Sequence, residues 1–361
     1  MKNKHSLLLI FIIFILFNIP ILTNLDSFIY LGKSDYSDIP ITHYPNLLFI
    51  QKSISEYHQL PLWSNLIFSG YPFAANPLSG LWYLPGWIFL IFSLPIGINI
   101  SLICHLLLGA YGMYFFLRSL EISEISSIFG SLALFFSAKI YAHIGAGHLS
   151  LIYAISWTPY LLLLTMKFKS KNTNYLNYIL SGVVWGLIIQ ADLRWSMIAL
   201  MIWLFLFSDR NITVVNNLKY MGASLFIGFL SSITSWLPLF EYVSLSTRSV
   251  MTSADRLVYS LSSTDLLNLT FPFFEGSAET KLYPGAIILL LTIIGIFLFK
   301  HNLSFRKWYL LGLISLILAF GNNIPGVELF YNIPGLSLTR VPSRYIFLLT
   351  FSLAIISAKV L

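Results

Sequence analysis

The sequence predicts an all-α membrane protein with about ten transmembrane helices. Two observations lead to this fold class, and the first is composition. Hydrophobic residues make up 57% of the 361 residues and the mean hydropathy is +0.80, whereas charged residues make up only 10%. A soluble domain carries roughly a quarter charged residues, because its surface faces water. So few charges cannot cover a globule of 41.0 kDa, and most of its outside is expected to face lipid.

The second observation is a series of apolar segments near the length of a membrane span, which is about 20 residues. These segments are 6–23, 98–118, 125–145, 149–166, 174–191, 194–208, 216–237, 281–299, 304–320 and 342–361. The short segment 194–208 could be tilted or partly interfacial. The stretch 78–96 is also apolar, but Pro85, Gly86 and Pro95 interrupt it. We expect a re-entrant or interfacial helix there instead of a span.

Basic residues indicate which ends of the segments face the cytoplasm. If Lys2 and Lys4 are cytoplasmic, strict alternation of the spans brings the other basic clusters to the same side. These are Arg118, Lys167, Lys169, Lys171, Arg210, Lys219, Lys300, Arg306 and Lys307. An excess of Lys and Arg in cytoplasmic loops is the usual pattern of membrane proteins. The sequence therefore predicts a multi-pass protein of the cell membrane with a cytoplasmic N-terminus.

The long loops and most of the acidic residues fall on the opposite side. The first extracytoplasmic loop covers 24–97, the fourth covers 238–280, and another long loop covers 321–341. Functional residues are often carried by loops on a rigid scaffold. We therefore expect residues 1–361 to form a single multi-spanning transmembrane domain whose active face is extracytoplasmic.

Charge and cysteine content limit the other functional classes. The net charge is +7, but the basic residues lie at segment ends and no basic stripe with stacking aromatic residues is present, so no nucleic-acid partner is expected. The only cysteine, Cys104, lies in an apolar run and excludes Cys-based metal sites. Segment 6–23 is longer than a signal-peptide core and lacks a small-residue cleavage site, which favours an uncleaved first helix.

The first outer loop contains the most informative residues. Asp35 and Asp38 follow the first helix by about a dozen residues and could accept a proton from an acceptor group or bind a metal. They could equally be solvated loop acids or helix caps. The run 46–58 has apolar residues near helical spacing, which predicts an amphipathic helix on the membrane surface. Its residues Lys52 and Glu56 should face water.

The loops also resemble a known family. The first loop resembles the signature of YfhO-type bacterial membrane proteins in Ser37-Asp38, His43-Tyr44-Pro45, Leu60-Pro61-Leu62-Trp63, Gly70-Tyr71-Pro72, Ala75-Asn76-Pro77 and Tyr83-Leu84-Pro85. Further segments resemble the family in the same order: Gly147-His148 through Trp157-Thr158-Pro159, Pro238 to Arg248, Pro272 to Gly285, and Pro334 to Arg344. Each motif is modest, but together they cover nearly the whole chain.

YfhO-type proteins belong with the GT-C class of polyprenyl-phosphate-dependent glycosyltransferases. The resemblance therefore implies a GT-C-like arrangement of helices and a polyprenyl-phosphate sugar donor. It also implies an acidic residue in the first loop as catalytic base or metal-associated acid. That role falls on Asp38, with Asp35 second, and a divalent cation stays open as a cofactor. Members of the family are commonly longer, so the chain is expected to be a short form or a fragment.

Six residues on the outer side are candidates for substrate binding. They are His43, His148, Glu241, Arg248, Arg340 and Arg344. Arg340 and Arg344 flank Pro342 just before the last segment, and the fork of an arginine suits a phosphate. Arg248 and Arg256 are weaker alternatives.

Two polar turns could also contribute to a site. His143 and His148 lie on either side of a glycine-rich turn, where they could coordinate a metal or contact phosphate, or simply form a polar turn. Asp192 and Arg194 lie in another turn, where they could contribute to the site or simply form an ion pair with each other.

The sequence thus predicts a hexosyltransferase-type enzyme that transfers sugar from a polyprenyl-phosphate donor to an extracytoplasmic acceptor. The acceptor could be a cell-envelope polymer, a glycolipid or a protein. Two alternatives stay open, namely a transporter or lipid flippase, and a non-catalytic partner with the same fold. The chain has no phosphate-binding glycine loop and no HExxH zinc motif, which makes a soluble sugar nucleotide the less expected donor.

Overall fold

The computed structural model describes residues 2–30, 36–67, 69–168, 175–207, 214–272, 276–298, 302–333, 336 and 339–361. Within these ranges the secondary structure is helical, and none of the described residues forms a β-strand. The predicted all-α class is therefore confirmed for the described part of the chain.

The α-helices in chain order are α1 (Lys2–Phe17), α2 (Ile19–Leu22), α3 (Tyr44–Ser55), α4 (Ile96–Ser119), α5 (Glu124–Phe135), α6 (Ala138–Gly145), α7 (Leu149–Phe168), α8 (Tyr175–Ala191), α9 (Leu193–Phe207), α10 (Val214–Ser231), α11 (Ile233–Ser244), α12 (Ser253–Arg256), α13 (Ala286–Leu298), α14 (Leu303–Phe320) and α15 (Ile346–Val360). Short helical turns in the loops include η1 (Ile39–His43), η3 (Leu84–Leu90), η4 (Thr247–Val250), η6 (Ala278–Thr280) and η10 (Pro342–Tyr345).

Several helices have the length and composition of membrane spans. Four described segments are long and apolar enough to cross a bilayer: Ile96–Ser119, Glu124–Gly145, Leu149–Phe168 and Pro342–Val360. A fifth is reached if the bent pair Asn216–Ser231 and Ile233–Ser244 counts as one span. Each of the ten predicted segments contains a helix, but α1, α8, α9 and α13 are shorter than a full span. The count of ten spans stays a prediction.

Two predicted segments are broken, each for a local reason. Segment 125–145 divides into α5 and α6 at Ser137, whose hydroxyl accepts a hydrogen bond from the Ile140 N–H and caps α6. Segment 216–237 bends by 75° between α10 and α11. There the Ser232 hydroxyl donates to the Gly228 carbonyl at 2.7 Å, a pattern that bends helices. Pro238, inside α11, has no N–H to donate to the Thr234 carbonyl, which weakens the first turn after the bend.

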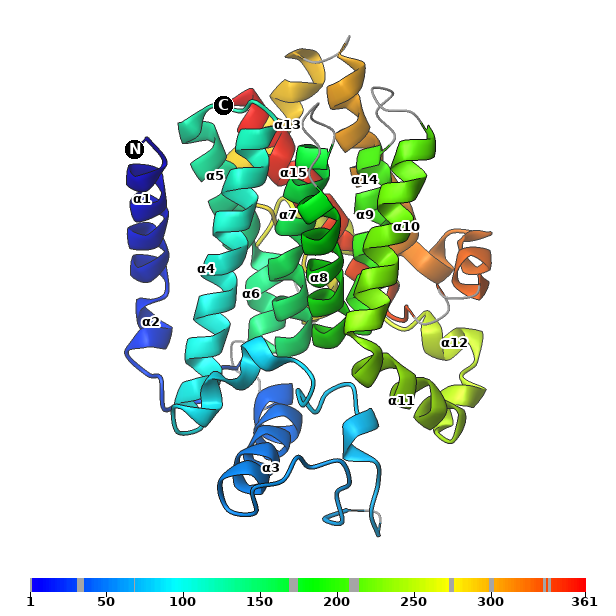
Figure 1. Cartoon of the computed structure of the whole chain (residues 1–361). Coiled ribbons are helices and arrows are strands. Elements are labelled where there is room, and N and C mark those ends of the chain that lie inside the picture. Colours follow the sequence, from blue (N-terminus) through cyan, green and yellow to red (C-terminus); the bar gives the residue numbers. More distant parts are fainter. Residues whose placement is uncertain are drawn as a thin grey trace.

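Small residues allow the central helices to approach closely. A Cβ at Gly112 of α4 would lie 2.6 Å from the Tyr160 ring of α7. On α8, a Cβ at Gly182 would lie 2.5 Å from Ile227 of α10. The GxxxG spacing of Gly182 and Gly186 therefore serves the contact between α8 and α10. Helices α4, α7, α8 and α10 stand side by side in the bundle (Figure 1).

The long loops and the basic flanks lie at opposite ends of this bundle. Helices α3, α11 and α12 lie at one end, and both chain termini lie at the other (Figure 1). A cavity of about 290 Å³ at the terminal end brings together Glu121, Asn302, Lys307 and Lys359. Lys307, one of the predicted cytoplasmic flanks, therefore lies at the end opposite α3 and α11, and the orientation relative to a membrane stays a prediction.

The first loop folds over its end of the bundle as an independent small layer. The helix predicted over 46–58 is present as α3, in which Ile50 is buried while Lys52 is exposed, and Glu56 just beyond it is also exposed. Segment 78–96 contains the 3₁₀ turn η3 and no spanning helix, as expected from its prolines.

Cysteine labelling tests the predicted topology. In a Cys104→Ala background, cysteines placed at the exposed positions Tyr57 and Leu245 should react with a membrane-impermeant maleimide on intact cells. Cysteines at the exposed positions Tyr175 and Arg306 should react only after permeabilisation, because alternation places them in the cytoplasm. Reaction of Leu245→Cys and Tyr175→Cys from the same side would contradict the ten-span topology.

Candidate functional site

The site is built where the first loop docks onto the turn between α6 and α7. The Asp38 N–H donates to the Ala146 carbonyl at 2.9 Å, which fixes the backbone of the loop against the turn. Gly147 has φ +84°, and a Cβ there would lie 2.5 Å from the backbone nitrogens of Asp38 and Ile39. Only glycine combines this backbone conformation with so close an approach. The Gly147-His148 pair therefore positions Asp38.

His43 also contributes to the contact between the first loop and the α6–α7 turn. It is buried at the end of η1 and forms a hydrogen bond with the backbone of Gly147. Burial lowers the pKa of His43 to about 4, so its ring is neutral at pH 7. His43 therefore contacts the turn, and its expected role in substrate binding stays a prediction.

Asp38 is the carboxylate of this site that is most open to solvent. Its side chain is 25% exposed, and its Oδ1 accepts a hydrogen bond of 2.8 Å from the Tyr36 hydroxyl. Its Oδ2 faces Nε2 of His148 at 3.6 Å. A carboxylate that is held by neighbours and still reachable is suited to accept a proton from a bound substrate.

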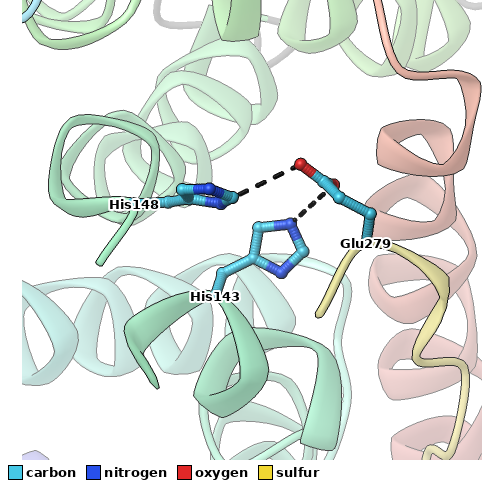
Figure 2. A group of neighbouring side chains, drawn as sticks. All are labelled: His143, His148 and Glu279. Carbon is cyan, nitrogen blue, oxygen red and sulfur yellow. Dashed lines mark hydrogen bonds and ion pairs between the residues drawn. The ribbon is translucent and has the colours of Figure 1, made fainter. Parts of the chain in front are cut away.

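A second carboxylate, Glu279 of η6, is more buried than Asp38, since its side chain is only 8% exposed. Figure 2 shows it facing His143 and His148. Its Oε1 accepts hydrogen bonds from Nε and Nη2 of Arg344 at 3.0 and 2.7 Å. Its Oε2 lies 3.0 Å from Nε2 of His143. The Lys139 ammonium donates to the backbone carbonyl of Glu279. Burial alone would raise the pKa of the Glu279 carboxyl, but His143, Arg344 and Lys139 outweigh it and hold that pKa well below its usual value.

His148 lies between the two carboxylates. Its Nε2 faces Asp38, and its Nδ1 is 3.9 Å from Oε1 of Glu279. Nδ1 is buried and has no hydrogen-bond partner. Burial, helped by the nearby His143, lowers the pKa of the His148 ring far below its usual value, so this ring is neutral at pH 7. His143, His148 and Glu279 each offer one atom that could ligate a metal, and these three atoms lie within 4.8 Å of one another. They are the candidate metal ligands among the described residues.

A cavity of about 350 Å³ lies at the same end of the bundle and is lined in part by residues of α9, α11 and α12. Its basic wall consists of Arg194, Arg256 and Arg340, and its apolar wall includes Leu78, Leu193, Leu239, Val243 and Met251. Arg194 lies within electrostatic range of both Asp38 and Glu279, which connects the cavity to the cluster. An anionic group with an apolar tail matches these walls.

The three arginines of the cavity differ in their partners. Arg194 forms an ion pair with Asp192, with Nε and Nη2 at 3.0 and 2.6 Å from the two carboxylate oxygens. Burial opposes ionisation of Asp192, but Arg194 lowers the pKa of that carboxyl to about 2. The Arg256 guanidinium donates a hydrogen bond to the Met251 carbonyl at 3.3 Å. Among the described residues, no carboxylate lies within ion-pair distance of Arg256 or Arg340. Asp192 also lines the cavity and Asp255 lies within electrostatic range of Arg340, so the three arginines leave the cavity with an excess of positive charge that is partly compensated.

The structure distributes the remaining predicted site residues as follows. Arg344 lies in the cluster with Glu279, and Arg340 lies in the cavity wall. Glu241 is exposed on α11 and takes part in neither group. Asp35 lies outside the described residues, as does the side chain of Arg248 in η4.

Two residues of the cluster were not predicted from the sequence. Lys139 lies within the apolar segment 125–145, and a lysine at membrane depth is costly enough to indicate a functional or paired residue. That signal was available. Glu279 is one of several acidic residues in a long loop, and nothing in its immediate sequence distinguishes it from Asp265.

No protein-family model, no curated protein and no solved structure matches this chain. The resemblance to YfhO-type proteins is therefore a hypothesis based on the motifs, and the functional argument depends on the site itself.

A pair of glycine substitutions tests how Asp38 is positioned. Gly147→Ala should lower thermal stability in detergent and displace the first loop, because the new Cβ meets the Asp38 backbone. Gly326 has nearly the same φ, +87°, but nothing lies within 4 Å of its Cβ position. Gly326→Ala should therefore cost only the backbone term, about 1–2 kcal/mol.

In Gly147→Ala the steric clash should add roughly 1–3 kcal/mol to that cost. Comparison of the two melting temperatures separates the clash from the strained backbone. Equal losses in both variants would mean that the loop does not press on Gly147.

Proposed function

We propose that this chain is a membrane glycosyltransferase that transfers a sugar from a polyprenyl-phosphate donor to an extracytoplasmic acceptor. The observation that carries the proposal is a reachable carboxylate, Asp38, within electrostatic range of Arg194, which lines a cavity with two further arginines and an apolar wall. The cavity has arginines that can bind the phosphate of a lipid-linked donor and apolar residues that can contact its lipid tail. The Asp38 carboxylate can act as a base toward the acceptor.

In the proposed reaction Asp38 acts as the general base. An acceptor hydroxyl gives its proton to a remaining lone pair of the Asp38 carboxylate while its oxygen bonds to the anomeric carbon of the sugar. The bond between that carbon and the phosphate oxygen breaks, and polyprenyl phosphate leaves. Attack from the side opposite the leaving group inverts the anomeric configuration. The Tyr36 hydroxyl at 2.8 Å helps to orient the carboxylate.

The arginines serve the leaving phosphate. Arg256 and Arg340 are half-buried and have hydrogen-bond donors to spare, so they can stabilise the negative charge that grows on the phosphate as the bond breaks. Arg344 is less suited to this contact than expected, because two of its donors already bind Glu279. We assign it to positioning Glu279.

The location of the site favours an enzyme over a transporter. Transporters commonly hold their substrate near the middle of the membrane, between repeated halves of the chain. Here Asp38, Arg256 and Arg340 belong to the loops at one end of the bundle. We propose that this end faces the outside of the cell membrane, where an acceptor of the cell envelope, a glycolipid or a protein would be reached.

Substitution of Asp38 tests the proposed base. Asp38→Asn keeps the size of the side chain and its contact with Tyr36 but removes the basic carboxylate. A positioned general base contributes ~10²–10⁴-fold to the rate, so transfer should fall by about that factor. The measurement is release of polyprenyl phosphate in proteoliposomes supplied with polyprenyl-phosphate hexoses and candidate acceptors.

Glu56→Gln is the matched control, since Glu56 is an exposed carboxylate just beyond α3 in the same loop. It should leave transfer unchanged. Asp35→Asn should lower the rate of transfer less than Asp38→Asn does. Full activity in Asp38→Asn would remove Asp38 as the base.

Arginine substitutions test the donor cavity. Arg340→Lys and Arg256→Lys should raise the KM for the donor by roughly 10–100-fold, because a hydrogen bond to a charged group is worth about 1.5–3 kcal/mol and lysine cannot reproduce the fork. Arg344→Lys should lower kcat and stability with little change in that KM. Arg306→Lys, at the other end of the bundle, is the control. A donor KM that responds only to Arg344→Lys would place the phosphate elsewhere.

A further inference from the structure

Three potential ligand atoms converge between α6, the α6–α7 turn and η6 (Figure 2). His143 approaches Glu279 with Nε2 at 3.0 Å from Oε2, and His148 approaches it with Nδ1 at 3.9 Å from Oε1. The two rings are 5.0 Å apart and lie at 65° to each other, so both present a nitrogen to the same carboxylate.

The hydrogen-bond partners of His143 show where its proton lies. Its Nδ1 is 3.0 Å from the Lys139 carbonyl, which can only accept, so Nδ1 carries a hydrogen. In a neutral ring Nε2 then has a lone pair that points at the Glu279 carboxylate. Two acceptors at 3.0 Å need a cation or a proton between them.

His148 repeats this arrangement. Its Nε2 faces the Asp38 carboxylate at 3.6 Å, which favours the hydrogen on Nε2 and leaves a lone pair on Nδ1. That lone pair is buried and has no hydrogen-bond partner. A buried polar atom without a partner is uncommon and indicates a missing ion, water or ligand.

We propose that His143 Nε2, His148 Nδ1 and Glu279 Oε2 bind one divalent transition-metal ion of the zinc class. Imidazole nitrogens suit zinc and its neighbours, and a His₂Glu set with an open fourth position is typical of catalytic zinc. The inference depends on side-chain geometry and not on which reaction the cluster serves.

The surroundings have the form expected around such ligands. A ligating histidine usually turns its other nitrogen to a carboxylate or a backbone carbonyl. For His148 this partner is Asp38, and for His143 it is the Lys139 carbonyl. Arg344 binds Oε1 of Glu279 and leaves Oε2 to the metal, and hydrogen bonds of this kind orient a ligating carboxylate.

The nearby charges indicate what would complete the coordination. The cations Arg344 and Lys139 balance the anions Glu279 and Asp38, so a divalent ion adds net positive charge to the cluster. An anionic fourth ligand would neutralise it. A phosphate oxygen is the chemistry that fits, given the arginines of the cavity at the same end of the bundle.

Metal binding to the purified full-length protein tests this inference without any sugar donor. The protein should carry no polyhistidine tag, and it should be stripped with a chelator in detergent and then titrated with Co²⁺ and Zn²⁺. We expect one Co²⁺ per chain with the visible absorption of a low-symmetry site, displaced by Zn²⁺. Inorganic phosphate should perturb that spectrum.

Variants assign the ion to its ligands. His148→Ala should abolish tight binding, and it is the safer choice because His148 is partly exposed, whereas Glu279→Gln also breaks the contacts of Arg344. Asp38→Asn should still bind the ion, but with an affinity about 10–100-fold lower, as expected when the hydrogen-bond partner of a metal ligand is lost. His58→Asn, at an exposed histidine, should bind normally.

Wild-type protein that binds no stoichiometric metal would overturn the proposal and leave a shared proton between His143 and Glu279. Binding that survives His148→Ala unchanged would also overturn it. Either result would leave the glycosyl-transfer proposal intact, since that proposal is tested by Asp38→Asn and product release.

Discussion

The buried carboxylate of Glu279 is the interaction on which the working end of the molecule depends. An ionised carboxylate away from water is stable only when it is surrounded by partners. Glu279 meets this requirement through Arg344 ahead of α15, His143 on α6 and Lys139 one turn earlier. These residues come from segments far apart in the chain. Their convergence ties together the loop 238–280, the α5–α6 segment and the segment that precedes α15.

The first loop is joined to this unit by a backbone contact. The hydrogen bond from Asp38 to Ala146 and the close approach at Gly147 set the loop on the α6–α7 turn. His148 follows Gly147 directly, so the residue that faces both carboxylates is carried by the same turn that holds the loop. Backbone packing thus places Asp38 and His148 together, and the side-chain partners of Glu279 complete the site.

Hydropathy and periodicity account for much of the fold. The apolar segments become helices because their backbone groups can be satisfied internally, and the amphipathic run beginning near Asn46 becomes α3 because one face has a surface to cover. The break at Ser137 and the bend at Ser232 were not anticipated. Both depend on serine side chains that bond to the backbone within one turn, which a hydropathy average does not register.

The site was only partly predictable for a related reason. Asp38, His148, Arg340 and Arg344 lie in motif-bearing loops and could be selected from the sequence. Their partners could not be deduced, because proximity in space is set by tertiary packing. Thus Arg344 was expected at a phosphate and instead binds Glu279, a residue that sequence inspection did not select.

The bend between α10 and α11 has a consequence for how the protein meets its surroundings. It turns α11 across the end of the bundle, where Leu239 and Val243 line the arginine cavity while Leu237 and Phe240 remain exposed. In the proposed orientation, a helix with apolar residues on both its inner and outer sides would bring the cavity wall into contact with the hydrocarbon of the membrane. A long-tailed molecule could then slide sideways into the cavity without leaving the lipid phase. For the proposed transferase, bilayer thickness and headgroup size would then affect the rate alongside the residues of the site.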